Sequence, residues 1–246
     1  TQGGNERTGM SGMDRNSPIV IGLDVGTQSV KLVAYDPQAR QVAATLGEAL
    51  ELASGDDGTR EQRAEWWIDA IRACFSRLDP ALRQRTSAIG VSGQQHGFVP
   101  LDRAGNVLAP AKLWCDTSTA AECDLIMDAV GGAQGAIATA GNPIMVGYTA
   151  SKLPWTREHR SQAYAQLATI LLPHDYVNFW LTGERWMERG DASGTGWLDV
   201  RTRQWSDAMI AATDPDRDLR PCLPPLVEAD AMFPIATAIA DELGLP

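Results

Sequence analysis

The feature that most constrains the fold of this chain is an apolar segment that runs into an acidic, glycine-containing turn. Residues 19–25 are apolar except at Gly22 and Asp24, polar residues cross the turn, and strand-type residues resume over 30–35. This pattern predicts a buried β-hairpin with a polar tip. The tip carries Asp24, Gly26, Thr27, Ser29 and Lys31.

The composition of this turn has two interpretations. Gly26 allows close approach of the backbone to a ligand, successive N–H groups can hold phosphate oxygens, and Asp24 at the strand end can hold Mg²⁺ through water. The other interpretation is a hairpin with a solvated polar tip, because short turn motifs recur by chance. The turn by itself does not decide between them.

A second polar loop follows a short apolar strand expected over 88–92. The loop contains Gln94, Gln95 and His96 between Gly93 and Gly97. Ligands of α/β folds usually bind at the carboxyl ends of strands, and amide and imidazole groups suit a neutral polyol. The simpler alternative is a polar turn in which the backbone satisfies His96.

Three other polar residues have open roles. Asp116 ends an apolar strand, and it is also suited to cap a helix expected over 117–130. Lys152 is either functional or a solvated lysine. Asp191 lies in a Gly/Ser-rich loop and either faces a cleft or forms a turn, whereas Asp175 is expected to cap a helix.

Charge and cysteine usage exclude several classes of protein. The formal net charge of −10 disfavours nucleic acid and anionic membranes as general partners. The four cysteines form no C-x-x-C pair and no cluster with metal-ligand spacing, which favours reduced thiols in a cytoplasmic protein. No segment has the apolar length of a membrane span. Residues 1–17 are polar and glycine-rich and are interpreted as a disordered leader.

The periodicity predicts an α/β fold. After the hairpin we expect a third antiparallel strand over 41–52, an amphipathic helix over 64–78, and a hairpin that pairs 98–101 with 107–108. Further helices are expected over 117–130, 151–158, 160–167, 175–181 and 206–212, with strands at 169–172 and 196–200. Three antiparallel strands followed by strand-helix alternation suit a mixed sheet flanked by helices, as in ribonuclease H.

The order of the motifs resembles a known family. The Asp-x-Gly-Thr-x-x-x-Lys pattern at 24–31 resembles the first phosphate loop of the actin/hexokinase/Hsp70 superfamily, and more narrowly that of the FGGY carbohydrate kinases. The loop at 93–97 resembles the sugar loop of the xylulokinases in that family, with Gln95 in place of the usual Met. The segments at 113–116, 148–155, 171–176 and 191–199 follow in the family's order, so the resemblance covers residues 18–246.

This resemblance implies a function and a set of site residues. It implies ATP-dependent phosphorylation of D-xylulose to D-xylulose 5-phosphate by an intact parent enzyme, with Mg²⁺ at Asp24 and sugar contacts at Gln95, His96 and Asp116. ATP phosphates would lie at the following residues: Gly26, Thr27, Gln28, Ser29 and Lys31. A homodimer is a further expectation.

In this family the catalytic aspartate and the adenosine site belong to a second, C-terminal domain. No substitute for that aspartate is evident in the sequence, so residues 18–246 are expected to form the N-terminal sugar-binding domain and to be inactive alone. The alternatives are a kinase for another polyol or sugar acid, and a stand-alone sugar-binding module. Glycerol kinases carry an Arg-Glu pair where this chain has Gln95-His96, which disfavours that substrate.

Overall fold

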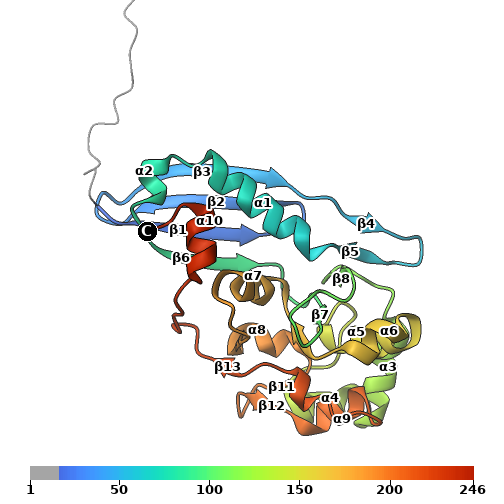
Figure 1. Cartoon of the computed structure of the whole chain (residues 1–246). Helices are drawn as coiled ribbons and strands as arrows, with labels where there is room; N and C mark the ends of the chain where they lie inside the picture. Colours follow the sequence, from blue (N-terminus) through green and yellow to red (C-terminus); the bar gives the residue numbers. More distant parts are fainter. Residues whose placement is uncertain (1–16) are drawn as a thin grey trace, which may run out of the picture.

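A four-stranded mixed sheet forms one side of the molecule in the computed structural model, which describes residues 17–246 (Figure 1). Its strand order is β3-β2-β1-β6. The strands are β1 (Ile19–Val25), β2 (Ser29–Asp36), β3 (Gln41–Ala49) and β6 (Thr86–Gly93). The first three are antiparallel, and β6 runs parallel to β1. The expected mixed sheet is therefore confirmed.

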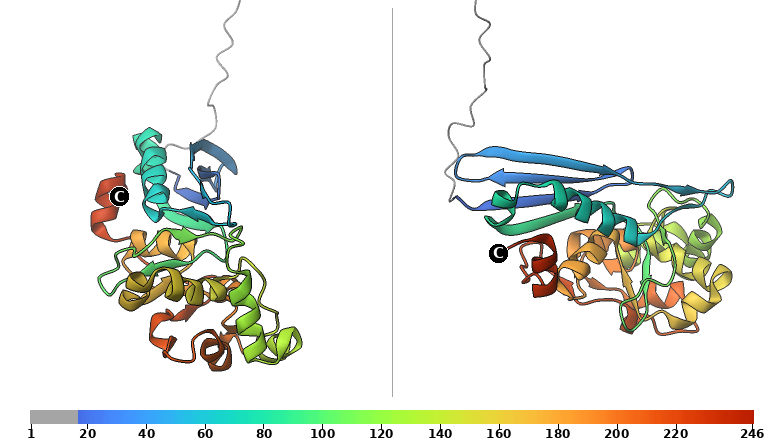
Figure 2. Two further views of the ribbon diagram at one scale, coloured as in Figure 1. Left: turned by 90° about the vertical axis from the view of Figure 1, so that its right-hand side faces the viewer. Right: turned by 45° about the horizontal axis from the view of Figure 1, so that its top comes forward.

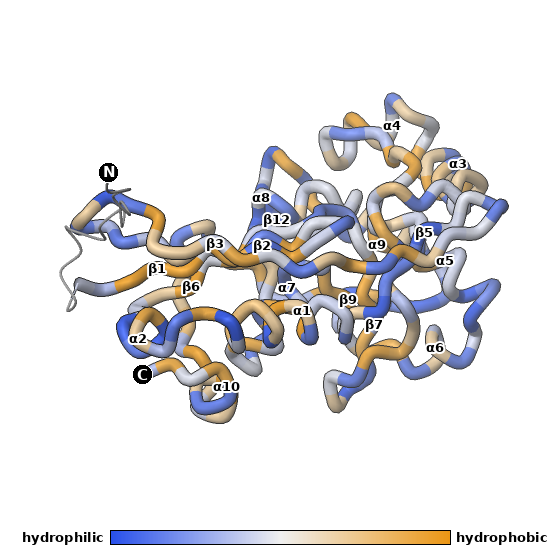
Figure 3. Tube along the Cα trace, turned by 90° about the horizontal axis from the view of Figure 1, so that it is seen from above, coloured by the Kyte–Doolittle hydropathy of each residue, from blue (hydrophilic) through white to orange (hydrophobic). Residues whose placement is uncertain are grey.

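The hairpin forms where the alternation of apolar residues predicts it. Ile19, Ile21, Leu23 and Val25 of β1 are buried, as are Val30, Leu32 and Ala34 of β2. Hydrophobic residues run along β1 at the centre of the sheet in Figure 3. The helix α1 (Ala64–Arg77) lies against β2 and β3 and buries Trp67 in the same core. Trp67 is therefore a core residue.

A second hydrophobic cluster lies within a mostly helical body below the sheet (Figures 1 and 2). This body contains α3 (Ala120–Ala129), α4 (Gly132–Ala140), α5 (Thr149–His159), α6 (Ser161–Gln166) and α9 (Asp207–Thr213). Trp197 is fully buried at its centre. The helix α7 (Pro173–Thr182) contacts β6 and α1, and buries Val177 and Leu181 in the core of the sheet.

The remaining elements are short. In chain order they are β4 (Ala53–Ser54), β5 (Arg60–Gln62), α2 (Pro80–Arg83), β7 (Val99–Leu101), β8 (Ala111–Lys112), β9 (Thr169–Leu171), β10 (Met187–Glu188), α8 (Arg189–Ala192), the 3₁₀ turn η1 (Ser193–Thr195), β11 (Leu198–Asp199), β12 (Gln204–Trp205), η2 (Arg220–Cys222), β13 (Leu226–Val227) and α10 (Thr237–Leu243).

Several predicted elements differ from the structure. The helix expected from 117 begins at Ala120, because the Asp116 carboxylate accepts hydrogen bonds from the Ser118 N–H and hydroxyl and holds that segment in a turn. The expected hairpin of 98–101 with 107–108 is reduced to a bridge between Leu101 and Val107, since β7 pairs with β9 instead.

The expected strand over 41–52 also differs, because β3 ends at Ala49.

The expected leader lies outside the described residues except for Ser17. Ser17 is buried, and its hydroxyl donates a hydrogen bond to Asp36.

Candidate functional site

A cavity of about 460 Å³ opens where the tip of the first hairpin meets the loop after β6. Its walls come from these two turns, from Trp114 and from the segment before α5. The lining residues are Asp24, Gly26, Thr27, Gly93, Gln94, Gln95, His96, Trp114, Val146, Gly147 and Tyr148. Five of the predicted site residues therefore share one cavity. Its two turns are far apart in the sequence, since Thr27 and Gln94 are separated by 67 positions.

Asp24 is the only carboxylate in this lining. It is exposed at the end of β1, where the Ser92 hydroxyl lies 3.4 Å from Oδ1. Lys31 is its cross-strand partner in β2 but does not reach the cavity wall. Within residues 17–246, Asp24 forms no ion pair, so its charge is not already neutralised by a protein cation.

The turn itself differs in detail from the expectation. The Gly26 N–H donates to the Ser29 carbonyl at 3.1 Å, so this amide closes the turn. A Cβ at Gly26 would lie 3.3 Å from the same oxygen, which explains why glycine suits the position. The N–H groups of Thr27 and Gln28 have no protein acceptor among the described residues. The side chains of Gln28 and Ser29 do not line the cavity.

Gln62 links the two turns, and it was not singled out in the sequence. It is fully buried, and its amide nitrogen donates to the carbonyls of Thr27 (2.8 Å) and Glu51 (2.7 Å). Its amide oxygen accepts from Gln94 Nε2 at 2.9 Å and from Trp67 Nε1 at 3.0 Å. One side chain therefore links the tip of the first hairpin to the loop after β6.

The Thr27 hydroxyl adds a second link between the turns. It donates to Gln94 Oε1 at 3.1 Å and accepts from Trp114 Nε1 at 3.0 Å. Trp114 is half exposed, so its indole presents an apolar face at the cavity. The sequence analysis did not identify Trp114 as part of the cavity wall. The only signal for it was its position two residues before Asp116.

His96 has the most constrained backbone in the site. Its φ of +61° lies in the left-handed region, and its ring centroid lies 4.6 Å from that of Tyr148. Gln95 Oε1 lies 2.8 Å from His96 Nε2. Because an amide oxygen only accepts, this contact places the proton of a neutral His96 on Nε2 and leaves Nδ1 as an acceptor. Burial and the nearby Lys152 lower the pKa of His96, which favours that neutral form.

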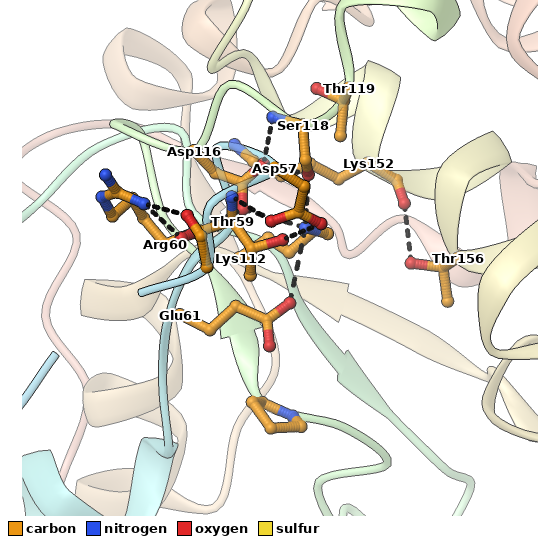
Figure 4. A network of polar contacts seen from close by, with 12 residues as sticks. Asp57, Thr59, Arg60, Glu61, Lys112, Asp116, Ser118, Thr119, Lys152 and Thr156 are labelled. Carbon is orange, nitrogen blue, oxygen red and sulfur yellow. Dashed lines mark hydrogen bonds and ion pairs between the residues drawn. The ribbon is translucent and has the colours of Figure 1, made fainter. Parts of the chain in front are cut away.

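The structure does not bring Asp116 into the cavity. Its side chain is fully buried and accepts hydrogen bonds from Lys112 Nζ (2.9 Å), from the Arg60 N–H (2.8 Å) and from Ser118 (Figure 4). Burial disfavours the charged form, but these donors together lower the pKa of Asp116. Asp116 is thus held in a buried ion pair outside the cavity lining, and its sugar contact stays a prediction.

His174 forms a second buried charge cluster beside Gly93 of the loop after β6. Its Nε2 lies 2.9 Å from Asp175 and 3.2 Å from Asp191, although neither contact has hydrogen-bond geometry. Burial opposes the charge, yet these carboxylates and Glu188 raise the pKa of His174 to about 9. Asp175 also accepts the Leu172 N–H at the start of α7, which confirms its capping role. Asp191 contacts His174 rather than the cavity.

The described residues hold no metal site made of protein groups alone. No group of three or more His, Cys, Asp or Glu side chains converges within residues 17–246.

The same part of the chain contains no helix with the length and apolar character of a membrane span.

Comparison with known proteins identifies the family. Residues 19–246 match the N-terminal domain of the FGGY family of carbohydrate kinases. The chain is similar to the xylulose kinases of Haemophilus influenzae (39% identity, 85% of this chain and 44% of the relative) and Escherichia coli (40%, 82% and 41%). It therefore spans less than half the length of these curated relatives.

The fold is likewise that of solved sugar kinases. The crystal structure of the xylulose kinase from Rhodospirillum rubrum superimposes with a TM-score of 0.85 at 26% identity, over 93% of this chain and 47% of that one. The sheet order and the flanking helices agree with the actin/hexokinase/Hsp70 fold of these enzymes. This chain belongs to the FGGY family of carbohydrate kinases and comprises the N-terminal domain of that family.

Proposed function

We propose that the protein to which this chain belongs transfers the γ-phosphoryl group of ATP to D-xylulose and forms D-xylulose 5-phosphate. The observation that carries the proposal is the single cavity that joins the Asp24 turn to the Gln95-His96 loop. Phosphoryl transfer requires a positioned hydroxyl and a neutralised phosphate, and these two turns offer groups of both kinds. The similarity to xylulose kinases supports D-xylulose as the sugar.

The donor groups of the phosphate turn fit a magnesium nucleotide. Mg²⁺ is commonly held by one or two carboxylates together with water and substrate phosphates, and Asp24 is an exposed carboxylate without an ion pair among the described residues. The N–H groups of Thr27 and Gln28 are available to phosphate oxygens. When bound, Mg²⁺ would neutralise charge on the transferred phosphoryl group.

The sugar side of the cavity fits a neutral ketopentose. His96 Nδ1 accepts a hydrogen bond from a sugar hydroxyl, and the Gln95 amide nitrogen donates one. Trp114 offers its indole face to the C–H surface of the sugar. None of these groups carries charge at neutral pH, so the wall provides no counter-charge for a sugar acid.

An ADP-release assay tests this assignment. The whole protein is expected to release ADP with D-xylulose, and far less with glycerol or gluconate as comparators. The chain of residues 1–246 alone is expected to bind D-xylulose weakly without releasing ADP, because its described residues place no second carboxylate in the cavity to act as a base. Equal turnover of the whole protein with gluconate would contradict the proposed substrate.

A further inference from the structure

Lys152 is a buried cation without an anionic partner. It lies in the first turns of α5, its side chain is fully buried, and no carboxylate is paired with it within residues 17–246. Burial of an unpaired charge is costly unless hydrogen bonds compensate for it. The sequence allowed a solvated lysine at this position, and the structure excludes that interpretation.

The Lys152 ammonium instead binds two backbone carbonyls. Nζ donates to the carbonyl of His96 at 2.6 Å and to that of Gly147 at 2.5 Å. Both residues line the cavity, but they belong to different walls of it. Thr149 in the same helix adds a weaker hydroxyl donor to the His96 carbonyl at 3.2 Å.

Both carbonyls belong to residues with unusual backbones. His96 has a φ of +61° and Gly147 a φ of +99°. At Gly147 a Cβ would lie 2.2 Å from the Trp114 carbonyl oxygen. The Gly147 backbone therefore packs directly against the backbone of Trp114, whose indole lines the cavity. A left-handed conformation at a non-glycine residue persists only where its surroundings hold it.

We propose that Lys152 is a positioning residue that fixes the sugar side of the cavity by joining the backbones of His96 and Gly147. The inference deepens the function proposed above and rests on it only for the identity of the sugar. Lys152 acts through the loop that carries His96 and does not line the cavity itself. The Lys152 ammonium bridges the His96 loop and the segment before α5 through their carbonyl groups.

The charge of Lys152 makes this role sensitive to pH. Burial is the main cause that lowers the pKa of Lys152 to about 7, and Lys112 adds to it while Asp116, Cys123 and Cys115 oppose it. Hydrogen bonds from an ammonium are roughly twice as strong as those from a neutral amine. The clamp is therefore expected to weaken between pH 6 and 8. Over this range the other neighbours keep their charge, because the pKa of His96 is lowered and burial raises those of both cysteines.

Lys112 offers a matched control. It is equally buried, but its ammonium is paired with Asp116 at 2.9 Å and with Glu61 at 3.4 Å (Figure 4). Among the described residues its side chain forms no hydrogen bond with His96 or Gly147. Lys152→Met and Lys112→Met therefore remove the same buried group from different partners. If both variants lose the same stability, the loss reflects removal of a buried lysine and not the contact of Lys152 with His96 and Gly147.

Amide hydrogen exchange of this chain tests the positioning role without any ligand. Lys152→Met is expected to accelerate exchange about tenfold in the segments 94–97 and 145–148, the effect of losing a charge-assisted hydrogen bond. At pH 6, where Lys152 is charged with or without Lys112, Lys112→Met should leave both segments unchanged. Unaltered exchange in Lys152→Met, or equal acceleration in both variants, would overturn the proposal. If Lys152→Met does not fold, exchange of the unsubstituted chain at pH 6 and 8, corrected for intrinsic rates, decides the question.

Calorimetry with D-xylulose separates this proposal from the proposed function. The affinity of the unsubstituted chain should fall from pH 6 to pH 8, and that of Lys152→Met should be weaker and independent of pH. A pH dependence that survives in Lys152→Met would contradict the proposed role. Absence of D-xylulose binding at every pH would instead contradict the sugar assignment, and the exchange experiment would still test the clamp.

Discussion

The buried side chains of Gln62 and Gln94 are hydrogen-bonded to each other, with Gln94 Nε2 donating to Gln62 Oε1 at 2.9 Å. Through this pair the strand β5 is linked to both turns of the cavity. We expect Gln62→Leu to lower the free energy of unfolding by about 3 kcal/mol, because it leaves buried donors and acceptors without partners. Urea denaturation measures the change, with the exposed Gln204→Leu as the control. A loss below about 0.5 kcal/mol would show that water replaces the amide.

Asp24→Asn in the whole protein should reduce turnover about 100-fold with little change in sugar affinity. The substitution keeps the shape of the side chain and removes the charge proposed to direct Mg²⁺, a contribution of several kcal/mol to the transition state. Steady-state kinetics at saturating Mg²⁺ and ATP measure it, and Asp56→Asn is an exposed control outside the cavity. Near-normal turnover would sink the assignment of Asp24.

His96→Ala should weaken D-xylulose binding by about 1–3 kcal/mol and affect nucleotide binding much less, because only the sugar loses a hydrogen-bond partner. His96→Asn is the informative companion, since asparagine tolerates the left-handed backbone found at this position. Calorimetry with each ligand measures both constants. Equal losses for sugar and nucleotide would indicate collapse of the loop rather than loss of a contact.

His174 is expected to stabilise the fold at low pH. Its pKa is raised from 6.5 to about 9, so the stabilisation is fully present below about pH 6.5 and is lost as the pH rises through about 9. The difference in unfolding free energy between the unsubstituted chain and His174→Gln should therefore shrink by about 3 kcal/mol across that range. Denaturation at a series of pH values measures it, with the exposed His159→Gln as the reference. A difference that is constant with pH would mean that His174 is neutral in the folded chain.

The sequence predicts what depends on local pattern. The alternation of apolar residues in 19–35 places β1 and β2 correctly, and the glycines around Gln95 and His96 mark the second turn of the cavity. The roles of Asp116 and Lys152 depend on partners that are distant in the chain or in other elements, so their types do not reveal them. Gln62 is a polar residue in a three-residue strand, and only burial shows its importance.

The two hydrophobic clusters have a consequence for how the molecule loses its function. The walls of the cavity come from both sides, with the hairpin tip belonging to the sheet and the segment before α5 to the helical body. Each side has its own packed interior, and the segments 98–101 and 170–172 contribute residues to both. Separation at this shared layer leaves the four-stranded sheet and the helices of the body intact. On heating, ligand binding is therefore expected to disappear before the far-ultraviolet circular dichroism changes. The contact between the sheet and the helical body then limits the temperature up to which the domain binds its ligands.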